Sequence, residues 1–418
     1  MHIIGQKDAN LNFWQLASII IVPTGIPGIL LSKTLADTYG CGAAITSILC
    51  ANLILWFIAF TIVSMTAQNR KNAIENAEEY IGKMGALLVS VLSMATFPIW
   101  GAIQMETSVD TIANIYDVGP RNILTAGGIF LGIILAIMAQ KGQIRLIKQL
   151  TVPFLPILIC YHLCSLFFVS EFKWIEGAGL FSLPCTFACI SFIFVGIVNF
   201  PTFCRYSRSS YDTYLSLTLM TIVITFFEIS SIWIGPDILL NYTFANSSGV
   251  IPYFALIFNG IFITFLLFSS TLVNIYFSYP FLVTLAPKIK RTTALFLIGL
   301  IVTFIFGFIR IFPDVKSYMG MLQILADDFI KNLGVVLVII FGFRLMIQHR
   351  PKPFEKFISL VSWIVGCSAT FLAVKYMTIT PPSLIGMWAT IGFFGLVMFI
   401  EEPFWSWRKL QKINKCAE

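Results

Sequence analysis

An aromatic ring and a carboxamide stand four residues apart in one apolar stretch, at Trp100 and Gln104. On a helix this spacing places both side chains on one face, one turn from each other. A planar heterocycle needs a flat surface to stack on and an amide that both donates and accepts hydrogen bonds. The pair therefore predicts a site for such a molecule, with Gly101 and Ala102 leaving room nearby. The competing interpretation is a tryptophan packed between helices and a glutamine bonded across their interface.

Three charged residues, Asp327, Asp328 and Lys331, stand inside another apolar stretch. Ionisable residues are expensive at membrane depth and indicate function by default. Lys331 is three residues from Asp328 and four from Asp327, so at least one ion pair can form within a helix. The second carboxylate could bind a proton or a cationic substrate, whereas the alternative is a helix bent towards a wet vestibule. Glu106 and Glu228 stand apart from these groups and are expected to be structural.

The composition identifies the environment of these stretches. The 418 residues are 58% hydrophobic and 11% charged, with a mean hydropathy of +0.87, whereas globular proteins carry about 25% charged residues. The chain has no phosphate-cradling loop and no nucleophile–base constellation, and it has only three histidines. The sequence thus predicts a polytopic membrane protein that is not an enzyme, binds no nucleic acid and needs no cofactor beyond a coupling ion.

Apolar spans of about 20 residues, the length that crosses a bilayer, recur twelve times along the chain. They lie near residues 11–36, 43–66, 85–114, 122–139, 147–169, 183–204, 212–235, 251–286, 292–311, 317–347, 354–375 and 383–402. With the N-terminus in the cytoplasm, most of the 27 lysines and arginines fall in inner loops and tails, as the positive-inside rule requires. We expect a single domain in the cell membrane, in contact with lipid, with both termini cytoplasmic and no obligate protein partner.

Two of these spans are interrupted at matching places in the two halves of the chain. The first carries two prolines and two glycines within residues 23–28, and the sixth carries Gly196, Asn199 and Pro201. Proline removes an amide donor and clashes with the preceding turn, so neither segment should continue as a regular helix. Freed backbone groups at membrane depth must line a cavity or bind something. Such paired interruptions are typical of the binding site of a secondary transporter.

An ordered set of motifs resembles the nucleobase:cation symporter-1 family, in particular its cytosine permease branch. The motifs are the broken first span, ANLIL at 51–55, Val152-Pro153, NFPTFCRYSR at 199–208, FSST at 268–271 and Ile275-Tyr276. The resemblance covers nearly the whole chain. It implies an all-α LeuT-type fold, with residues 11–169 and 183–347 as inverted repeats of five helices, 354–402 as two peripheral helices and 403–418 as a tail. It also implies uptake of a nucleobase-like heterocycle, such as a cytosine, purine or hydantoin, driven by Na⁺ or H⁺.

Further substrate contacts are expected from the interrupted spans and from the eighth span. A second ring from Phe192 or Phe194 should cover the other face of the heterocycle, with Asn199 as a polar contact; in a chain with 40 phenylalanines, either ring could equally belong to the core. Asn274 could reach the same cavity. Backbone amides exposed at the helix break would add directional contacts, and they are expected around Gly25 and Gly28.

The resemblance also implies where sodium would bind. Ser269 and Ser270 stand where family members place paired hydroxyls, and the break at Val22 to Ile26 would supply carbonyls. A hard cation prefers such oxygen ligands, although serines in membrane helices also bond their own backbone. If Asp327, Asp328 and Lys331 carry a proton instead, uptake should follow pH. We favour sodium, because the span-10 charges can partly neutralise one another.

Two other functions compete with nucleobase symport. A LeuT-fold carrier for amino acids or another small solute would capture a carboxylate at a glycine-rich first helix, and Pro27 argues against that. A channel is disfavoured by the paired interruptions. The sequence does not choose among heterocycles, because several suit a slot made of a tryptophan and an amide.

Overall fold

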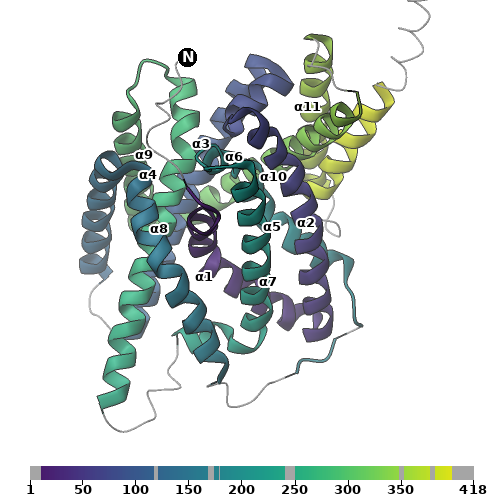
Figure 1. The fold of residues 1–418 in the computed structure, drawn as a ribbon. Helices are drawn as coiled ribbons and strands as arrows, with labels where there is room; N and C mark the ends of the chain where they lie inside the picture. The colour runs from purple at the N-terminus through teal and green to yellow at the C-terminus, as the bar shows by residue number, and fades with distance from the viewer. Residues whose placement is uncertain are drawn as a thin grey trace, which may run out of the picture.

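The computed structural model describes residues 11–116, 121–167, 174–177, 179–240, 250–347, 353–376 and 382–397. These residues form a bundle of helices and contain no β-strand (Figure 1). The helices are α1 (Phe13–Tyr39), α2 (Cys41–Asn69), α3 (Ala73–Tyr116), α4 (Arg121–Phe167), α5 (Leu183–Asn199), α6 (Pro201–Cys204), α7 (Ser210–Leu240), α8 (Val250–Leu285), α9 (Arg291–Ile311), α10 (Pro313–Ile347), α11 (Pro353–Tyr376) and the shorter Pro382–Val397.

Eight helices in this part of the chain are long and apolar enough to cross a membrane. Their bounds follow the predicted spans closely, because the apolar length of a segment determines both. Helix α4 joins the predicted spans 122–139 and 147–169, and its two apolar stretches are Asn122–Lys141 and Ile144–Leu163. A kink at Gly82, where φ is 79°, separates a polar first segment of α3 from its apolar remainder. The predicted total of twelve spans, the repeats and the orientation of the termini stay predictions.

The two predicted interruptions look different in the structure. Helix α1 is assigned continuously through residues 23–28, so its break is not confirmed; the side chains of residues 23–30 lie outside the described part. In the sixth span, α5 ends at Asn199 and the one-turn α6 begins at Pro201. Phe200 between them keeps helical angles, φ −54° and ψ −34°. Pro201 thus removes a hydrogen bond from the helix without unwinding a longer segment.

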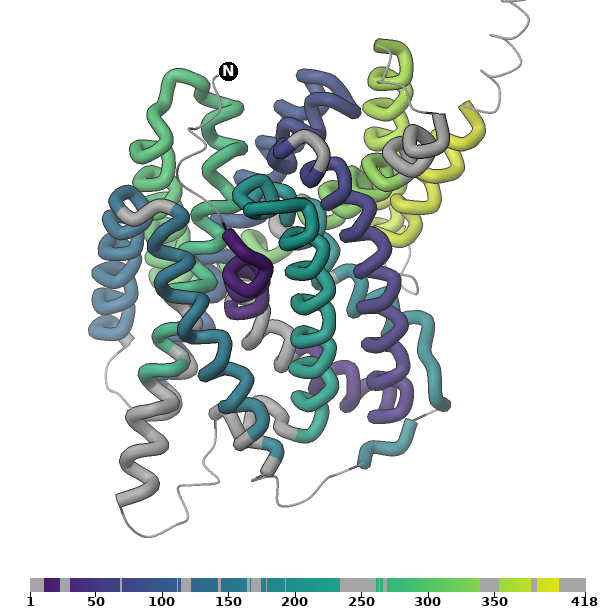
Figure 2. Tube along the Cα trace, in the orientation of Figure 1, coloured from purple at the N-terminus to yellow at the C-terminus, as the bar shows by residue number. Residues whose placement is uncertain are grey.

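Helix α1 lies in the middle of the bundle, with α4 and α8 on one side and α7 and α2 on the other (Figures 1 and 2). Its first residues are fixed to the turn after α6. The Leu11 amide donates to the Tyr206 carbonyl at 3.0 Å, and the Arg208 amide donates to the Leu11 carbonyl at 2.9 Å. A capping box between Asn12 and Gln15 satisfies the first amides of the helix. These hydrogen bonds attach the start of α1 to the end of the sixth span.

Small residues let α11 and the Pro382–Val397 helix pack closely. A Cβ atom on Gly386 would lie against the Thr370 hydroxyl and 2.7 Å from both the Gly366 carbonyl and the Asn332 Nδ2. Glycine and threonine at such crossings let the backbones of membrane helices approach. Asn332 of α10 also donates to Thr370 at 2.9 Å, so this contact attaches both helices to the bundle.

Gly386→Ala should destabilise the protein by about 1–3 kcal/mol, because the added methyl overpacks a contact that contains backbone atoms. Thermal unfolding of the purified protein in detergent measures the effect. Gly392→Ala is the matched control, since a Cβ atom on Gly392 of the same helix meets nothing within 4 Å. Equal unfolding temperatures for the two variants would contradict the close approach.

Candidate functional site

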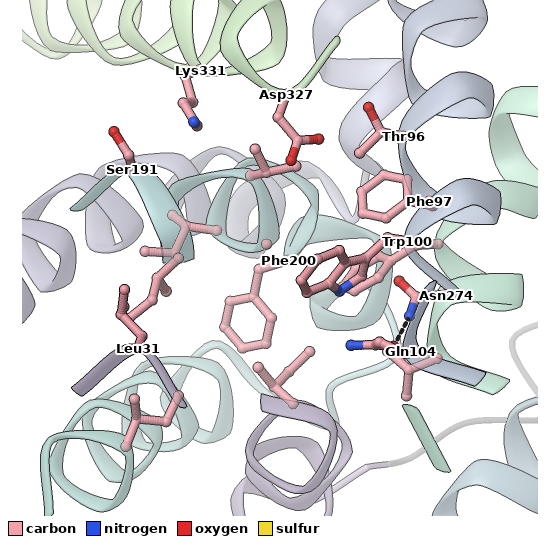
Figure 3. Close-up of a pocket in the computed structure, with 18 of the residues that line it drawn as sticks. Leu31, Thr96, Phe97, Trp100, Gln104, Ser191, Phe200, Asn274, Asp327 and Lys331 are labelled. Atoms are coloured by element: carbon pink, nitrogen blue, oxygen red, sulfur yellow. Dashed lines mark hydrogen bonds between the residues drawn. The ribbon is translucent and has the colours of Figure 1, made fainter. Parts of the chain in front are cut away.

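A cavity of about 450 Å³ lies among α1, α3, α5, α7, α8 and α10. Its lining is mostly apolar, with polar side chains at a few places (Figure 3). That size and composition are typical of small-molecule sites. Of the residues predicted to have a functional role, the structure brings Trp100, Gln104, Asn274, Asp327 and Lys331 together in this cavity. They come from α3, α8 and α10, so three helices far apart in sequence build one site.

Aromatic rings form the middle of the cavity. Trp100 and Phe97 line it from α3, and Phe200 lines it from the turn between α5 and α6 (Figure 3). Phe97 is held in place by Phe277 of α8, with ring centroids 5.1 Å apart and stacked. Flat rings supported from behind offer a preformed stacking surface to a planar ligand. Sequence reasoning missed Phe97 and Phe200; the only signal was that Phe97 precedes Trp100 by three residues, the spacing of a shared helix face.

A network of amides forms the polar end of the cavity beside Trp100. Gln104 Oε1 accepts hydrogen bonds from Asn274 Nδ2 at 2.9 Å and from the Ser270 hydroxyl. Asn274 Nδ2 also donates to the Ser270 carbonyl at 3.0 Å. These bonds fix both amides and leave Gln104 Nε2 as a donor and Asn274 Oδ1 as an acceptor, with no protein partner among the described residues. Figure 3 shows the Gln104 amide below the indole ring and the Asn274 amide beside it, joined by their hydrogen bond.

Gly101 lies where α3 meets α8 and α9. A Cβ atom on Gly101 would lie 3.5 Å from the Asn274 Cβ and 3.5 Å from Val302 of α9, which is ordinary van der Waals contact. The expectation that Gly101 leaves room for a ligand stays a prediction.

Charged side chains of α10 lie at the opposite end of the cavity. Lys331 Nζ lies 2.8 Å from Asp328 Oδ1, and both side chains are buried, so the predicted ion pair within the helix is confirmed. Asp327 and Lys331 also line the cavity, where Figure 3 shows both side chains above the aromatic rings. The cavity thus has an amide end and a charged end, with aromatic rings between them.

Comparison with solved structures assigns the architecture. Mhp1, a nucleobase-cation-symport-1 family transporter in a closed conformation with bromovinylhydantoin bound, matches with a TM-score of 0.67 and 14% identity, over 93% of each chain. A Na⁺-coupled sialic acid symporter in a substrate-bound outward-open state matches with a TM-score of 0.64 and 14% identity, over 93% of this chain and 89% of that one. A manganese transporter mutant from Eremococcus coleocola matches with a TM-score of 0.57 and 12% identity, over 96% of each chain.

The chain has the LeuT-type fold. The expected all-α architecture is therefore confirmed. Neither a protein-family model nor the sequence of a curated protein matches the chain. At such low identity the likeness to solved structures is one of fold, and function lies in the site that the fold carries.

Two of the predicted substrate contacts lie away from the cavity. Phe194 is 1% exposed and packs against Gly334 of α10. Asn199 is 2% exposed, and its Nδ2 donates to the Val195 carbonyl of its own helix at 3.0 Å. Because α5 continues as a helix to Asn199, the amide nitrogen is bonded one turn back within its own helix. The side chain of Phe192, and Gly25 and Gly28 within α1, lie outside what the structure describes in detail.

The predicted sodium ligands are described only in part. Ser269 is fully buried, and its hydroxyl donates to the Phe265 carbonyl at 3.0 Å. The Ser270 hydroxyl donates to Gln104, so it belongs to the amide end of the cavity. Val22 is buried in α1, and Ile26 lies among the residues whose side chains are not described. Sodium binding at these residues stays a prediction.

Proposed function

We propose that the protein is a secondary transporter, which imports a nucleobase or a related planar heterocycle with a cation across the cell membrane by alternating access. The observation that carries the proposal is the arrangement of Trp100, Gln104 and Asn274 in one cavity. A nucleobase or hydantoin edge presents N–H and C=O groups side by side. The Asn274 acceptor and the Gln104 donor complement that edge, while the ring stacks on Trp100.

The fold of the chain supports a transporter but is compatible with several classes of substrate. Mhp1, whose structure holds bromovinylhydantoin, shares the fold with a sialic acid symporter and a manganese transporter. A metal as substrate finds no support in the described residues, which contain no group of three or more His, Cys, Asp or Glu side chains that could hold one. An amino acid or another small solute is the alternative. An amino acid would need a cationic group that binds its carboxylate. Lys331 is the cation that lines the described part of the cavity, and it is paired with Asp328.

The coupling cation is the open part of the proposal. Sodium would bind at Ser269 and Ser270 with carbonyls of α1, whereas a proton would bind a carboxyl group. The Ser270 hydroxyl donates to Gln104. Because this hydroxyl already has a partner in the amide network, the contact favours a carboxyl group as the site of the coupling ion.

Gln104→Ala should weaken uptake of the natural substrate about 5- to 150-fold, because ring polar groups left unpaired in a closed cavity cost about 1–3 kcal/mol. Uptake of a radiolabelled panel of cytosine, purines, uracil and hydantoins by cells that express the protein measures the effect, with and without Na⁺. Thr107→Ala is the control, since Thr107 lies on the exposed face of the same helix and its hydroxyl bonds only the Ile103 carbonyl in the described contacts.

The panel also tests the proposed function itself. Uptake of at least one planar heterocycle above the background of cells without the protein is expected, and competition by unlabelled amino acids is not. No uptake of any heterocycle, together with uptake of an amino acid, would replace the proposal with its alternative.

A further inference from the structure

A carboxyl group lies buried in α7 with a single hydrogen-bond donor. Glu228 is 1% exposed, and its Oε2 accepts from Asn52 Nδ2 of α2 at 2.6 Å. Its Oε1 is fully buried and has no hydrogen-bond partner among the described residues. The amide of Asn52 also donates to Thr225 Oγ1 at 2.9 Å, which fixes its orientation towards α7. One amide bond leaves the charge of a carboxylate largely uncompensated at this place.

The other buried carboxyl groups of the described chain differ in that each has a cation beside it. Glu106 Oε2 lies 2.9 Å from Lys316 Nζ, and Asp328 Oδ1 lies 2.8 Å from Lys331 Nζ. Asp212, at the start of α7, lies 3.3 Å from the Arg208 guanidinium. Glu106 thus has a cationic partner, which fits the expected structural role, whereas Glu228 has none in the described contacts. An ionisable side chain without a partner inside a membrane protein indicates a functional site.

The surroundings of Glu228 contain titratable groups but no cation in the described contacts. The thiol of Cys189 on α5 lies near it, and Cys185 is the neighbour of Cys189 on the same helix. On α4, His162 stacks on Phe227 with ring centroids 4.2 Å apart, and its Nδ1 lies 3.1 Å from the Leu158 carbonyl. Helix α2 contributes the neutral Asn52, and residues 13–22 of α1, which packs along α7, include no titratable side chain. No cation neutralises Glu228 in the described contacts, and the uptake of a proton would do so.

The carboxyl group lies close to the cavity wall. Ile224 lies four residues before Glu228 on α7 and lines the cavity. Ala188, the residue before Cys189 on α5, also lines it. Residues four apart on a helix are neighbours on the same face. A proton on Glu228 therefore changes the charge about one helical turn from the cavity lining.

We propose that Glu228 binds the proton that is transported together with the substrate, an inference that rests on the proposed function and specifies its coupling ion. The carboxylate takes up one proton from water on the side of higher proton concentration and becomes a neutral carboxyl group. It returns the same proton to water on the other side after the cavity has changed its access. No other group is consumed. The neutral form can keep the Asn52 bond through its carbonyl oxygen and gains an O–H donor on the other oxygen.

Transport by the purified protein in proteoliposomes tests the coupling. For one proton per substrate, an inward gradient of one pH unit should drive about tenfold accumulation of a substrate found with the heterocycle panel. Glu228→Gln, which resembles the protonated form, should abolish this accumulation while exchange of labelled for unlabelled substrate continues. Glu106→Gln is the matched control, because it neutralises a buried carboxyl group that already has a lysine partner; it should keep the pH-driven accumulation. Accumulation driven by the pH gradient in Glu228→Gln would overturn the proposal.

Infrared difference spectra of the same protein without substrate give an independent measurement. Between about pH 5 and pH 9, the range in which a buried glutamate can titrate, a band of a protonated carboxyl group should appear and disappear in the wild type. Asn52→Ala should shift that band, because it removes the hydrogen bond to this carboxyl group, and this arm remains informative if Glu228→Gln does not fold. A wild type without a titrating band, or a band insensitive to Asn52, would overturn proton binding at Glu228. Failure of the wild type to take up any heterocycle would instead contradict the proposed function. The infrared spectra, recorded without substrate, would still report whether Glu228 binds a proton.

Discussion

Trp100→Ala should weaken substrate binding about 5- to 150-fold, because stacking a base on an aromatic side chain contributes about 1–3 kcal/mol. The indole lies in the middle of the cavity, between the amide end and the charged end. Removing it leaves the Gln104 and Asn274 amides in place but takes away the flat surface that orients the ring against them. Equilibrium binding of the radiolabelled substrate to the purified protein measures the loss directly.

Two further variants make the result specific to stacking. Trp100→Phe keeps a smaller flat ring and should lose less affinity than Trp100→Ala. Trp388→Ala removes a tryptophan that is 64% exposed on the Pro382–Val397 helix, outside the cavity lining, and should bind like the wild type. Unchanged affinity in Trp100→Ala, with equal amounts of folded protein, would place the substrate elsewhere.

Helix bounds could be predicted well from the sequence, because the ends of an apolar segment mark the ends of the membrane helix. The predicted span 292–311 corresponds to α9, Arg291–Ile311, and the predicted span 354–375 corresponds to α11, Pro353–Tyr376. Contacts within one helix could also be predicted from the sequence, as for Lys331 and Asp328, which are three residues apart. Such relations depend only on the period of the helix.

Contacts between helices were harder to predict, because helical periodicity gives a face but not its partner. Gln104 and Asn274 are 170 residues apart, and only the resemblance suggested that both reach one cavity. Phe194 was expected at the site but packs beneath α10, while Phe200, next to the proline, lines the cavity. The Asn52–Glu228 bond joins residues 176 apart and left no signal in either local sequence.

The ion pair of α10 gives the second large expected effect. Lys331→Met should destabilise the protein by about 3–5 kcal/mol, because it leaves Asp328 charged and buried without its partner. Both side chains are nearly inaccessible to solvent, 9% and 6% exposed, so water does not replace the lost contact. Chemical denaturation of the purified protein in detergent, or its thermal unfolding, measures the change.

The double variant Asp328→Asn with Lys331→Met separates a structural role from a functional one. Neutral side chains of similar volume should restore most of the stability, because replacing a whole buried pair is often neutral or stabilising. If the restored protein takes up substrate at the wild-type rate, the pair serves the fold of α10. If it is stable but inactive, the cavity-facing Lys331 takes part in transport, since stability no longer explains the loss. A double variant as unstable as Lys331→Met alone would contradict the pairing, because the cost would then come from lost packing at Lys331 and not from an isolated charge.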